Sequence, residues 1–448
     1  KPEQTDEQTM PGGATTATLF VLILLALCSC SCTASSDRVL SLPEYGAVKG
    51  VQYAGMAPVN TTANGQLFYY FVECTHCVDS TKAPIVLWTQ GGPGASSSMG
   101  LFMEMGPYTI LENATLRDNP NAWTRVASIL FLDQPVETGY SFSDSGAYVE
   151  TLDVMATNVL TMFRVFFERH PEYRQNALFL ASESFGGHYT PAIASELERS
   201  EFAPQLGGIL IGNGWIHPEV QHFSFQEYGH NLGLIDEQQR AHANLLAINA
   251  TAALRYAELT DLRSDWIAAH QAADACEEYV VNSAGLVTED NVQAVTNPLQ
   301  PQTDALTVYL NRADVRDALH VPTRRVWTLS SSAANQALGG EIEKSVLYLF
   351  PGFLRHMRVW IYVGNMDMTC NVVGIDGTLA SLQWDGREPF AEAPRKLWKV
   401  DGLLAGYAKT YERLTYVVVR NAGHEVPFYQ PRNSLDLFQR FVENRAFD

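Results

Sequence analysis

A serine stands where an apolar run gives way to a helix-compatible segment. Residues 177–181 are apolar, the text Ser182-Glu183-Ser184-Phe185-Gly186 follows, and residues 190–197 suit a helix. Small residues two positions before and after Ser184 permit the sharp strand-to-helix turn that lifts a serine hydroxyl out of a sheet. The N-terminus of the following helix favours negative charge that develops there. A Ser/Gly-rich loop without chemistry is the alternative, and this pattern alone does not decide between the two.

Strand-like and helical segments alternate along the chain on both sides of Ser184. Apolar runs typical of buried strands occupy residues 84–89, 128–133, 208–214, 358–363 and 415–419, and Asn64-Gly65 predicts a hairpin between residues 51–53 and 66–72. A helix is predicted over residues 152–169, which repeat apolar side chains at helical spacing. This alternation predicts an α/β fold with a central, mostly parallel sheet.

The character of the sequence changes between residues 216 and 344. Strand-like runs nearly vanish there, and Ala- and Glu-rich helical text such as residues 237–262 dominates. We expect a helical cap insertion over the carboxyl edge of the sheet, where ligands of such folds bind. The predicted organisation is a signal peptide with upstream residues (1–34), a first core part (35–215), the cap (216–344) and a second core part (345–448).

A nucleophilic serine needs a base, and the base needs an orienting carboxylate. Asp367 follows the predicted strand 358–363, and His424 follows the predicted strand 415–419. The order Ser184, Asp367, His424 is that of α/β-hydrolase triads. The Gly-rich segment 90–98 after an early strand suits an oxyanion hole, and it lacks the Gly-Lys-Ser/Thr ending of a phosphate loop.

The net charge and the N-terminal segment indicate which partners and which cellular compartment to expect for this protein. A formal net charge of −19 excludes a nucleic-acid-binding surface as the main function and suits an acidic compartment. The apolar run 19–27 fits a signal peptide, with Met10 as a candidate start and cleavage near Ala34, and no other run reaches membrane-spanning length. We therefore expect a secretory-pathway protein, secreted or lysosomal/vacuolar, without a membrane anchor.

The cysteines and the glycosylation triplets agree with this compartment. Three of the seven cysteines (Cys28, Cys30, Cys32) fall in the predicted signal region, and the other four allow three full pairings: Cys74, Cys77, Cys276 and Cys370. The motif Cys74-Thr75-His76-Cys77 leaves a redox or zinc role open beside a disulfide or free thiols. No metal and no cofactor is expected. Acceptor asparagines for N-glycosylation are Asn60, Asn113 and Asn249.

Several separate blocks, in matching order from about residue 40 to 445, resemble the serine carboxypeptidase family of the carboxypeptidase Y and cathepsin A type. They are residues 87–97, 131–141, 183–189, 211–215 and 314–321, together with the segments around Asp367 and His424. Gln90 and the segments 396–400 and 405–407 are similar to the vitellogenic-like carboxypeptidase branch. The resemblance implies an α/β-hydrolase fold and release of single amino acids from peptide C-termini through an acyl-enzyme.

The resemblance also implies roles for individual residues. Ser184, Asp367 and His424 correspond to the family triad, and the backbone N–H groups of Gly92 and Phe185 to the oxyanion hole. The residues that correspond to binding of the substrate's C-terminal carboxylate are Trp88, Gln90, Gly91, Glu104 and Glu183. Two carboxyl groups held close share a proton, so a Glu104–Glu183 pair would bind a carboxylate only at acidic pH. An acidic pH optimum is therefore expected.

Several positions depart from the family pattern. Gln90 stands where most members have Asn, which places its amide one methylene further out. Ser182 stands in place of Gly, Gly186 in place of Ala and Phe185 in place of Tyr. These changes at the turn are tolerable because the small residues remain small and the oxyanion contact uses the backbone.

The expected partners are peptide or protein substrates with a free C-terminus, and a homodimer is left open. Two other functions remain open at this point. One is a family-related acyltransferase or esterase with the same triad. The other is a catalytically weak, yolk-associated binding protein, against which the presence of all three triad residues argues.

Overall fold

The computed structural model describes residues 37–60, 64–323 and 325–447. The predicted signal segment, with Cys28, Cys30 and Cys32, lies outside these residues, as do Thr61 and Thr62 of the Asn60 triplet. Residues from Asp37 onward form one compact unit. Among the described residues, no helix is both long and apolar enough to cross a membrane.

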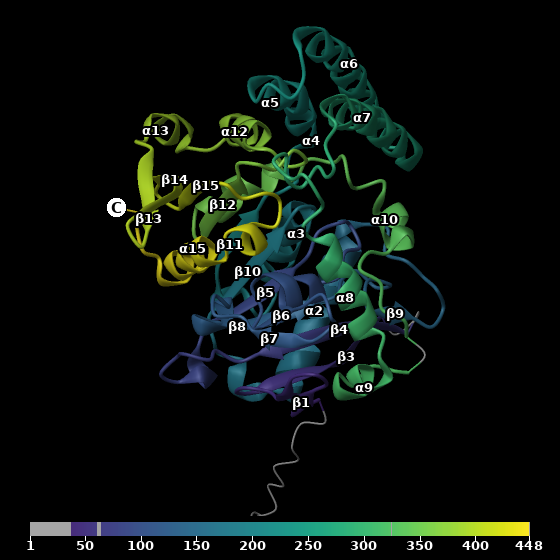
Figure 1. The fold of residues 1–448 in the computed structure, drawn as a ribbon, viewed down its shortest axis with the longest axis vertical. Coiled ribbons are helices and arrows are strands. Elements are labelled where there is room, and N and C mark those ends of the chain that lie inside the picture. The colour runs from purple at the N-terminus through teal and green to yellow at the C-terminus, as the bar shows by residue number, and fades with distance from the viewer. Residues whose placement is uncertain (1–36, 61–63, 324, 448) are drawn as a thin grey trace, which may run out of the picture. The chain divides into compact units, whose positions relative to one another are not determined.

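Within the described residues, one 11-stranded sheet runs through the unit (Figure 1). Its order is β13-β14-β15-β12-β11-β10-β5-β8-β4-β3, with β9 paired to β4. The strands β8, β5, β10, β11, β12 and β15 run parallel, and antiparallel strands lie at both edges. The predicted α/β fold is therefore confirmed, with a mixed sheet that is parallel at its centre and antiparallel toward both edges.

The strand bounds follow the apolar runs of the sequence. In the large sheet they are β3 (Gln52–Asn60), β4 (Gly65–Val72), β5 (Ile85–Thr89), β8 (Ser128–Leu132), β9 (Phe142–Ser143), β10 (Leu178–Glu183), β11 (Leu206–Gly212), β12 (Arg358–Gly364), β13 (Lys396–Val400), β14 (Leu403–Tyr411) and β15 (Leu414–Val419). Two small sheets are formed by β1 (Ser41–Leu42) with β2 (Gly46–Ala47) and by β6 (Tyr108–Ile110) with β7 (Leu116–Asp118). The predicted hairpin across Asn64-Gly65 is the β3–β4 pair.

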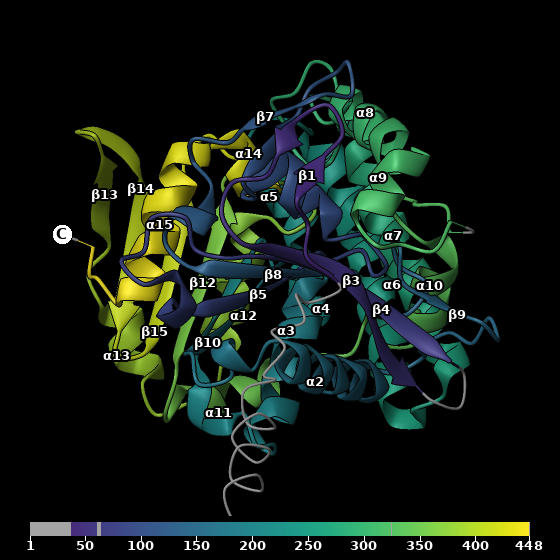
Figure 2. The same cartoon turned by 90° about the horizontal axis from the view of Figure 1, so that it is seen from below.

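Helices cover both faces of the sheet (Figure 2). The helices outside the segment between β11 and β12 are α2 (Leu152–Arg169), α3 (Gly186–Glu198), α12 (Val372–Ser381), α13 (Arg387–Glu392), α14 (Val426–Tyr429) and α15 (Pro431–Glu443). Side chains of β10 alternate between two hydrophobic clusters: Leu178 and Leu180 pack with α2 and α3, and Phe179 and Ala181 pack with α15. Burial on both faces explains why the central strands read as continuous apolar runs.

The segment between β11 and β12 is helical. It contains α4 (Pro218–Gln221), α5 (Phe225–Asn231), α6 (Glu237–Thr260), α7 (Arg263–Ala284), α8 (Gln300–Leu310), α9 (Ala313–Ala318), α10 (Ser332–Leu338) and α11 (Phe350–Leu354). The part of this segment that the structure describes contains no strand. Helices α5, α6 and α7 lie together at one end of the molecule (Figure 1). The cap boundaries themselves stay a prediction.

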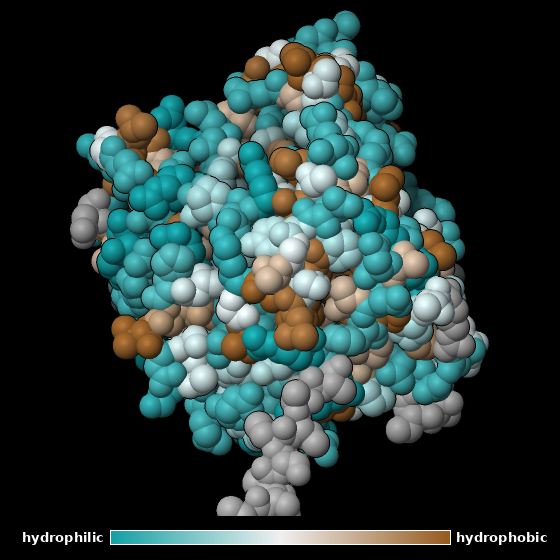
Figure 3. Space-filling model, turned by 60° about the horizontal axis from the view of Figure 1, so that its bottom comes forward, coloured by the Kyte–Doolittle hydropathy of each residue, from teal (hydrophilic) through white to brown (hydrophobic). Residues whose placement is uncertain are grey.

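The surface is largely polar. The face in Figure 3 is mostly hydrophilic, with hydrophobic side chains in small groups rather than one broad area. Large apolar side chains that are exposed, such as Val78, Leu259 and Val295, come from different parts of the chain. Single exposed apolar side chains of this kind are ordinary for a globular protein.

Candidate active site

The predicted strand-to-helix turn is present at Ser184. Strand β10 ends at Glu183, α3 begins at Gly186, and Ser184 between them has a φ of 62°. Its N–H donates to the carbonyl oxygens of Gly212 and Asn213, each at 3.1 Å, and its own carbonyl accepts from Trp215 N–H at 2.8 Å. Because a left-handed conformation is costly for serine, these contacts are what hold the turn in place. The serine therefore lies at the carboxyl edge of the sheet and at the N-terminus of α3.

Ser182 and Gly186, two departures from the family pattern, compensate each other. A Cβ atom placed on Gly186 would lie 2.4 Å from Ser182 Cβ. Alanine therefore fits at position 186 only where position 182 has no side chain. The Ser182 hydroxyl accepts a hydrogen bond from Thr190 Oγ1 at 2.7 Å, so it also ties the turn to α3.

Gly186→Ala should lower the free energy of unfolding by about 1–3 kcal/mol, since overpacking a buried turn forces backbone shifts. The double variant Gly186→Ala/Ser182→Gly should recover most of this loss. It should not recover all of it, because Thr190 Oγ1 loses its acceptor, which costs about 1 kcal/mol. Denaturant unfolding of the two variants and of Ser182→Gly alone measures the coupling. Additive effects would show that the two positions do not compensate.

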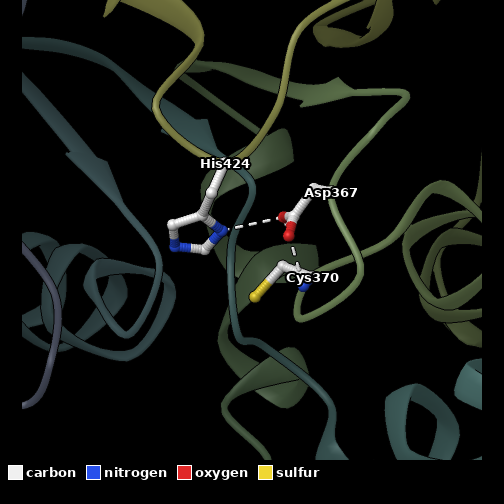
Figure 4. Close-up of side chains that lie close together, drawn as sticks. All are labelled: Asp367, Cys370 and His424. Carbon is white, nitrogen blue, oxygen red and sulfur yellow. Dashed lines mark hydrogen bonds and ion pairs between the residues drawn. The ribbon is translucent and has the colours of Figure 1, made fainter. Parts of the chain in front are cut away.

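The predicted base and carboxylate meet on neighbouring loops (Figure 4). His424 Nδ1 lies 2.8 Å from Asp367 Oδ2, and both side chains are buried. Asp367 follows β12 and His424 follows β15, which are adjacent parallel strands, so their carboxyl ends bring the two residues together. Thr369 N–H and Cys370 N–H donate to Asp367 Oδ1 and Oδ2 at 2.9 and 3.1 Å. This carboxylate is therefore held in one orientation.

Asn213 is a supporting residue that the reasoning from sequence missed. Its Nδ2 donates to Asp367 Oδ2 at 2.7 Å, and its Oδ1 accepts from Gly364 N–H at 3.0 Å. Asn213 also takes part in the turn through its carbonyl oxygen, which accepts from Ser184 N–H. One residue after β11 thus links the serine turn to the carboxylate loop. Its position directly after a central strand was the signal that could have identified it.

The charge state of His424 depends on the carboxyl groups around it. Burial opposes the imidazolium form, but the negative charges of Asp367, Glu425 and Glu183 raise the pKa of His424 well above its usual value. In the described part of the chain, no hydrogen bond joins Ser184 Oγ to His424. Such contacts are often loose in unliganded hydrolases and tighten when substrate binds.

Two backbone donors face the cavity next to Ser184. Gly92, Ser184 and Phe185 line one cavity of about 180 Å³. Among the described residues, neither Gly92 N–H nor Phe185 N–H has a hydrogen-bond acceptor. A Cβ atom on neighbouring Gly91 would lie 2.6 Å from Phe185 N, so only glycine lets this loop approach the turn so closely. Two free donors beside a serine hydroxyl can stabilise an oxyanion.

The five residues predicted to bind a carboxylate are all buried and lie next to the serine turn. Trp88 Nε1 donates to Gln90 Oε1 at 3.0 Å, which fixes the orientation of the amide. Gln90 Nε2 then donates to Glu104 Oε1 at 3.1 Å and to Glu183 Oε1 at 2.7 Å. Glu104 comes from the π-helical turn η2 (Gly100–Glu104), and Glu183 is the last residue of β10. The longer Gln90 side chain therefore reaches both carboxyl groups.

The pKa values of both glutamates are raised, which favours the protonated form of their carboxyl groups. Burial raises the pKa of Glu104 to about 7, although hydrogen bonds with Gln90 and Glu183 oppose this rise. Burial and the negative charges of Glu104 and Glu425 raise the pKa of Glu183 well above its usual value. The second oxygens, Glu104 Oε2 and Glu183 Oε2, are buried and, outside the pair itself, have no partner among the described residues. Protonated, the pair can donate a hydrogen bond to an anionic ligand.

Cys370 lies close to the Asp367–His424 pair but differs from it chemically (Figure 4). Potential ligand atoms of Asp367, Cys370 and His424 lie within 4.8 Å of one another. Burial and nearby carboxylates raise the pKa of the Cys370 thiol well above its usual value, so the thiolate that a metal requires is disfavoured. The Asp367 and His424 atoms that face each other are already joined by a hydrogen bond. The group therefore suits an Asp–His pair better than a metal.

The remaining cysteines and the glycosylation triplets lie away from these residues. Cys74 and Cys77 form a disulfide, while Cys276 and Cys370 are free and buried. Asn113 and Asn249 are exposed, as glycosylation acceptors must be, and glycosylation at Asn60, Asn113 and Asn249 stays a prediction.

Comparison with known proteins places this arrangement in a family. The family model described as serine carboxypeptidase matches residues 43–444. The pheromone-processing carboxypeptidase KEX1 of Podospora anserina is 33% identical over 411 residues, covering 86% of this chain and 69% of the relative. The venom serine carboxypeptidase of Apis mellifera is 34% identical over 408 residues, covering 88% of this chain and 85% of the relative.

A solved structure supports the fold. The prohormone-processing carboxypeptidase Kex1 from Saccharomyces cerevisiae superimposes with a TM-score of 0.79 at 23% identity, covering 88% of this chain and 91% of that chain. The family match extends over nearly all of the described residues. This α/β-hydrolase chain belongs to the serine carboxypeptidase family.

Proposed function

We propose that Ser184, His424 and Asp367 act as nucleophile, base and orienting carboxylate of this serine-type carboxypeptidase, with the substrate's C-terminal carboxylate bound at the Gln90–Glu104–Glu183 group. The observation that carries the proposal is the buried Glu104–Glu183 pair directly beside the serine turn, held by Gln90 and with raised pKa values for both carboxyl groups. Protonated carboxyl groups can donate a hydrogen bond to an anionic ligand, whereas ionised ones would repel it. A general esterase has no need of such a pair.

The proposed reaction proceeds through an acyl-enzyme. Ser184 Oγ attacks the last peptide carbonyl while its proton passes to His424 Nε2, since Nδ1 is bonded to Asp367. Gly92 N–H and Phe185 N–H stabilise the oxyanion. The C–N bond breaks, His424 returns the proton to the leaving amine, and one amino acid is released. Water then attacks the ester, with His424 taking its proton and returning it to Ser184.

Digestion of a peptide library at about pH 5, read by mass spectrometry, tests the proposal, because at that pH the Glu104–Glu183 pair is protonated and can donate to the terminal carboxylate. Each peptide should lose single residues from its C-terminus, and C-terminally amidated copies should react far more slowly. Internal cleavage, or equal rates for free and amidated peptides, would contradict binding of the terminal carboxylate.

Peptidase activity should fall as pH rises through about 7, the pKa of Glu104. Below this pH both carboxyl groups are protonated and can donate to the substrate carboxylate. Above it the pair becomes more negative and repels the substrate, so KM should rise by about tenfold per pH unit. Steady-state kinetics on one peptide across this range measures the effect.

The matched variants are Glu104→Gln and, as a control, Glu112→Gln at an exposed site. Glutamine remains a neutral donor at every pH, so Glu104→Gln should flatten the rise in KM, while the control should not. An ester without a free carboxylate should show no such rise with the wild-type enzyme. A peptide KM that is independent of pH would refute the role of the pair.

We infer a secretory-pathway location, secreted or lysosomal. The Cys74–Cys77 disulfide supports it, because disulfides persist in oxidising compartments. The predicted acid dependence suits the lysosomal or vacuolar option. One relative is named as a venom serine carboxypeptidase, which agrees with export from the cell.

A further inference from the structure

The cavity at Ser184 is lined by the serine turn, by residues of the helical segment between β11 and β12, and by Thr369 and Cys370. Gly92, Ser184 and Phe185 line its near side, and neither Gln90, Glu104 nor Glu183 lines it. If the C-terminal residue lies at the Gln90–Glu104–Glu183 group, as proposed above, the residue on the acyl side of the cleaved bond must point into this cavity. Its far wall therefore selects the P1 side chain.

That far wall is rich in ionisable groups. They are His222, His270, Asp274, Glu277 and Glu343. Three of them, His270, Asp274 and Glu277, lie on α7 at positions i, i+4 and i+7, which share one helix face. Among the described residues that line the cavity, there is no lysine or arginine. The wall thus offers three carboxyl groups, with the two histidines as the only basic side chains among its described residues.

The two histidines are already paired with one of the carboxylates. Glu343 accepts from His222 Nε2 at 2.7 Å and from His270 Nδ1 at 2.8 Å. Although burial opposes it, these histidines lower the pKa of Glu343 to about 2, so its charge is balanced inside the protein. His270 lies 3.5 Å from Asp274, a longer and weaker contact. Glu343 is therefore satisfied, and Asp274 and Glu277 remain for a ligand.

Of the carboxyl groups on this wall, Glu277 has the fewest contacts that stabilise its ionised form. Burial and the negative charges of Glu289, Asp274 and Asp367 raise its pKa to about 8, against a smaller opposing effect of Thr369. Burial likewise raises the pKa of Asp274. A carboxyl group in this setting takes up a proton when the cavity is empty. A cationic side chain beside it would instead favour the ionised form and a charge-assisted hydrogen bond.

We propose that this cavity selects lysine or arginine at P1, with Glu277 and Asp274 on α7 as the specificity-determining residues. The long apolar stem of such a side chain passes Trp215 and Ile342, which also line the cavity, and its cationic end reaches α7. A neutral side chain would leave Glu277 with only its hydrogen bond to Thr369. A carboxylate at P1 would face repulsion from Asp274 and Glu277.

Kinetics on N-blocked dipeptides X-Leu, with X as Arg, Lys, Met or Glu, tests this proposal. The wild-type enzyme should favour Arg and Lys over Met by about tenfold or more in kcat/KM, and Glu should be the poorest. Glu277→Gln should lower the Arg-to-Met ratio by about tenfold. The control Glu278→Gln, exposed on the same helix, should leave that ratio unchanged.

The design separates specificity from folding and from the proposed function. Glutamine copies the neutral form that Glu277 adopts in the empty cavity, so thermal unfolding of Glu277→Gln should match the wild type. Glu277→Lys should move the preference from Arg toward Glu at P1. A wild-type preference for Met, or an unchanged ratio in Glu277→Gln, overturns the inference alone. No leucine release from any dipeptide overturns the proposed function and this inference with it.

Discussion

Replacing Ser184 by alanine should lower kcat by about 10⁴- to 10⁶-fold, because the acyl-enzyme can no longer form. Substrate binding should change little, since Gln90, Glu104 and Glu183 would hold the terminal carboxylate without the Ser184 hydroxyl. Single-turnover assays on one peptide measure the loss in kcat. A fluorophosphonate probe should label the wild-type protein at Ser184 and fail to label the variant.

The control for this experiment is Ser264→Ala, an exposed serine on α7. It should retain both hydrolysis and labelling. Residual hydrolysis in Ser184→Ala within about tenfold of the wild type would exclude Ser184 as the nucleophile. Labelling at another serine would indicate that a different residue attacks the substrate.

Asp367→Asn should lower kcat by about 10⁴-fold, because the imidazolium of His424 loses the charge that stabilises it. Four donors converge on this carboxylate, from Asn213, Thr369, Cys370 and His424. An asparagine must turn its own NH₂ group toward at least one of them. The loss should appear in kcat with KM nearly unchanged, and Asp385→Asn, at an exposed position, should have no effect.

The double variant Ser184→Ala/Asp367→Asn provides a stricter test. Residues that act as one catalytic unit show strongly non-additive effects, so the double variant should be no slower than Ser184→Ala alone. If the losses in kcat of the two single variants multiply in the double variant, Asp367 supports the fold rather than the serine chemistry.

The core elements could be predicted from sequence because their signals are local. The apolar side chains of residues 152–169 recur at helical spacing, and the structure gives α2 those bounds. The turn at Ser184 was predicted from small residues, but α3 begins four residues earlier than expected. Gly186 and Gly187 are weak helix formers, yet packing against Ser182 and Trp215 excludes any side chain there. Tertiary contact therefore overrode local propensity.

Two strand features escaped prediction for different reasons. Strand β3 continues through Pro58 to Asn60, which is tolerated because β3 is an edge strand and needs no N–H there. The β13–β14 hairpin was not predicted, although Asp401-Gly402, both with positive φ, is a recognised hairpin signal.

The site was only partly accessible to sequence reasoning. Chain order and the positions of strand ends predicted Asp367 and His424. The family resemblance supplied the five residues that are predicted to bind the substrate carboxylate. The sequence did not reveal the acidic face of α7. His270, Asp274 and Glu277 look like ordinary residues of an amphipathic helix, and only the fold brings them to the cavity at Ser184. The disulfide partner of Cys74 was also undetermined, since four cysteines allow three pairings. Kinship to the vitellogenic-like branch stays a prediction.

Glu183 and Ser184 are consecutive residues of one turn, so a single peptide unit sets the spacing between terminal-carboxylate binding and nucleophilic attack. Neither residue can shift without the other. In the proposed mechanism, the turn would accept only a substrate whose last peptide carbonyl carbon stands one α-amino acid away from its terminal carboxylate. A C-terminal β-amino acid, which inserts one more backbone atom, would place that carbon out of line with Ser184 and protect the peptide from the enzyme.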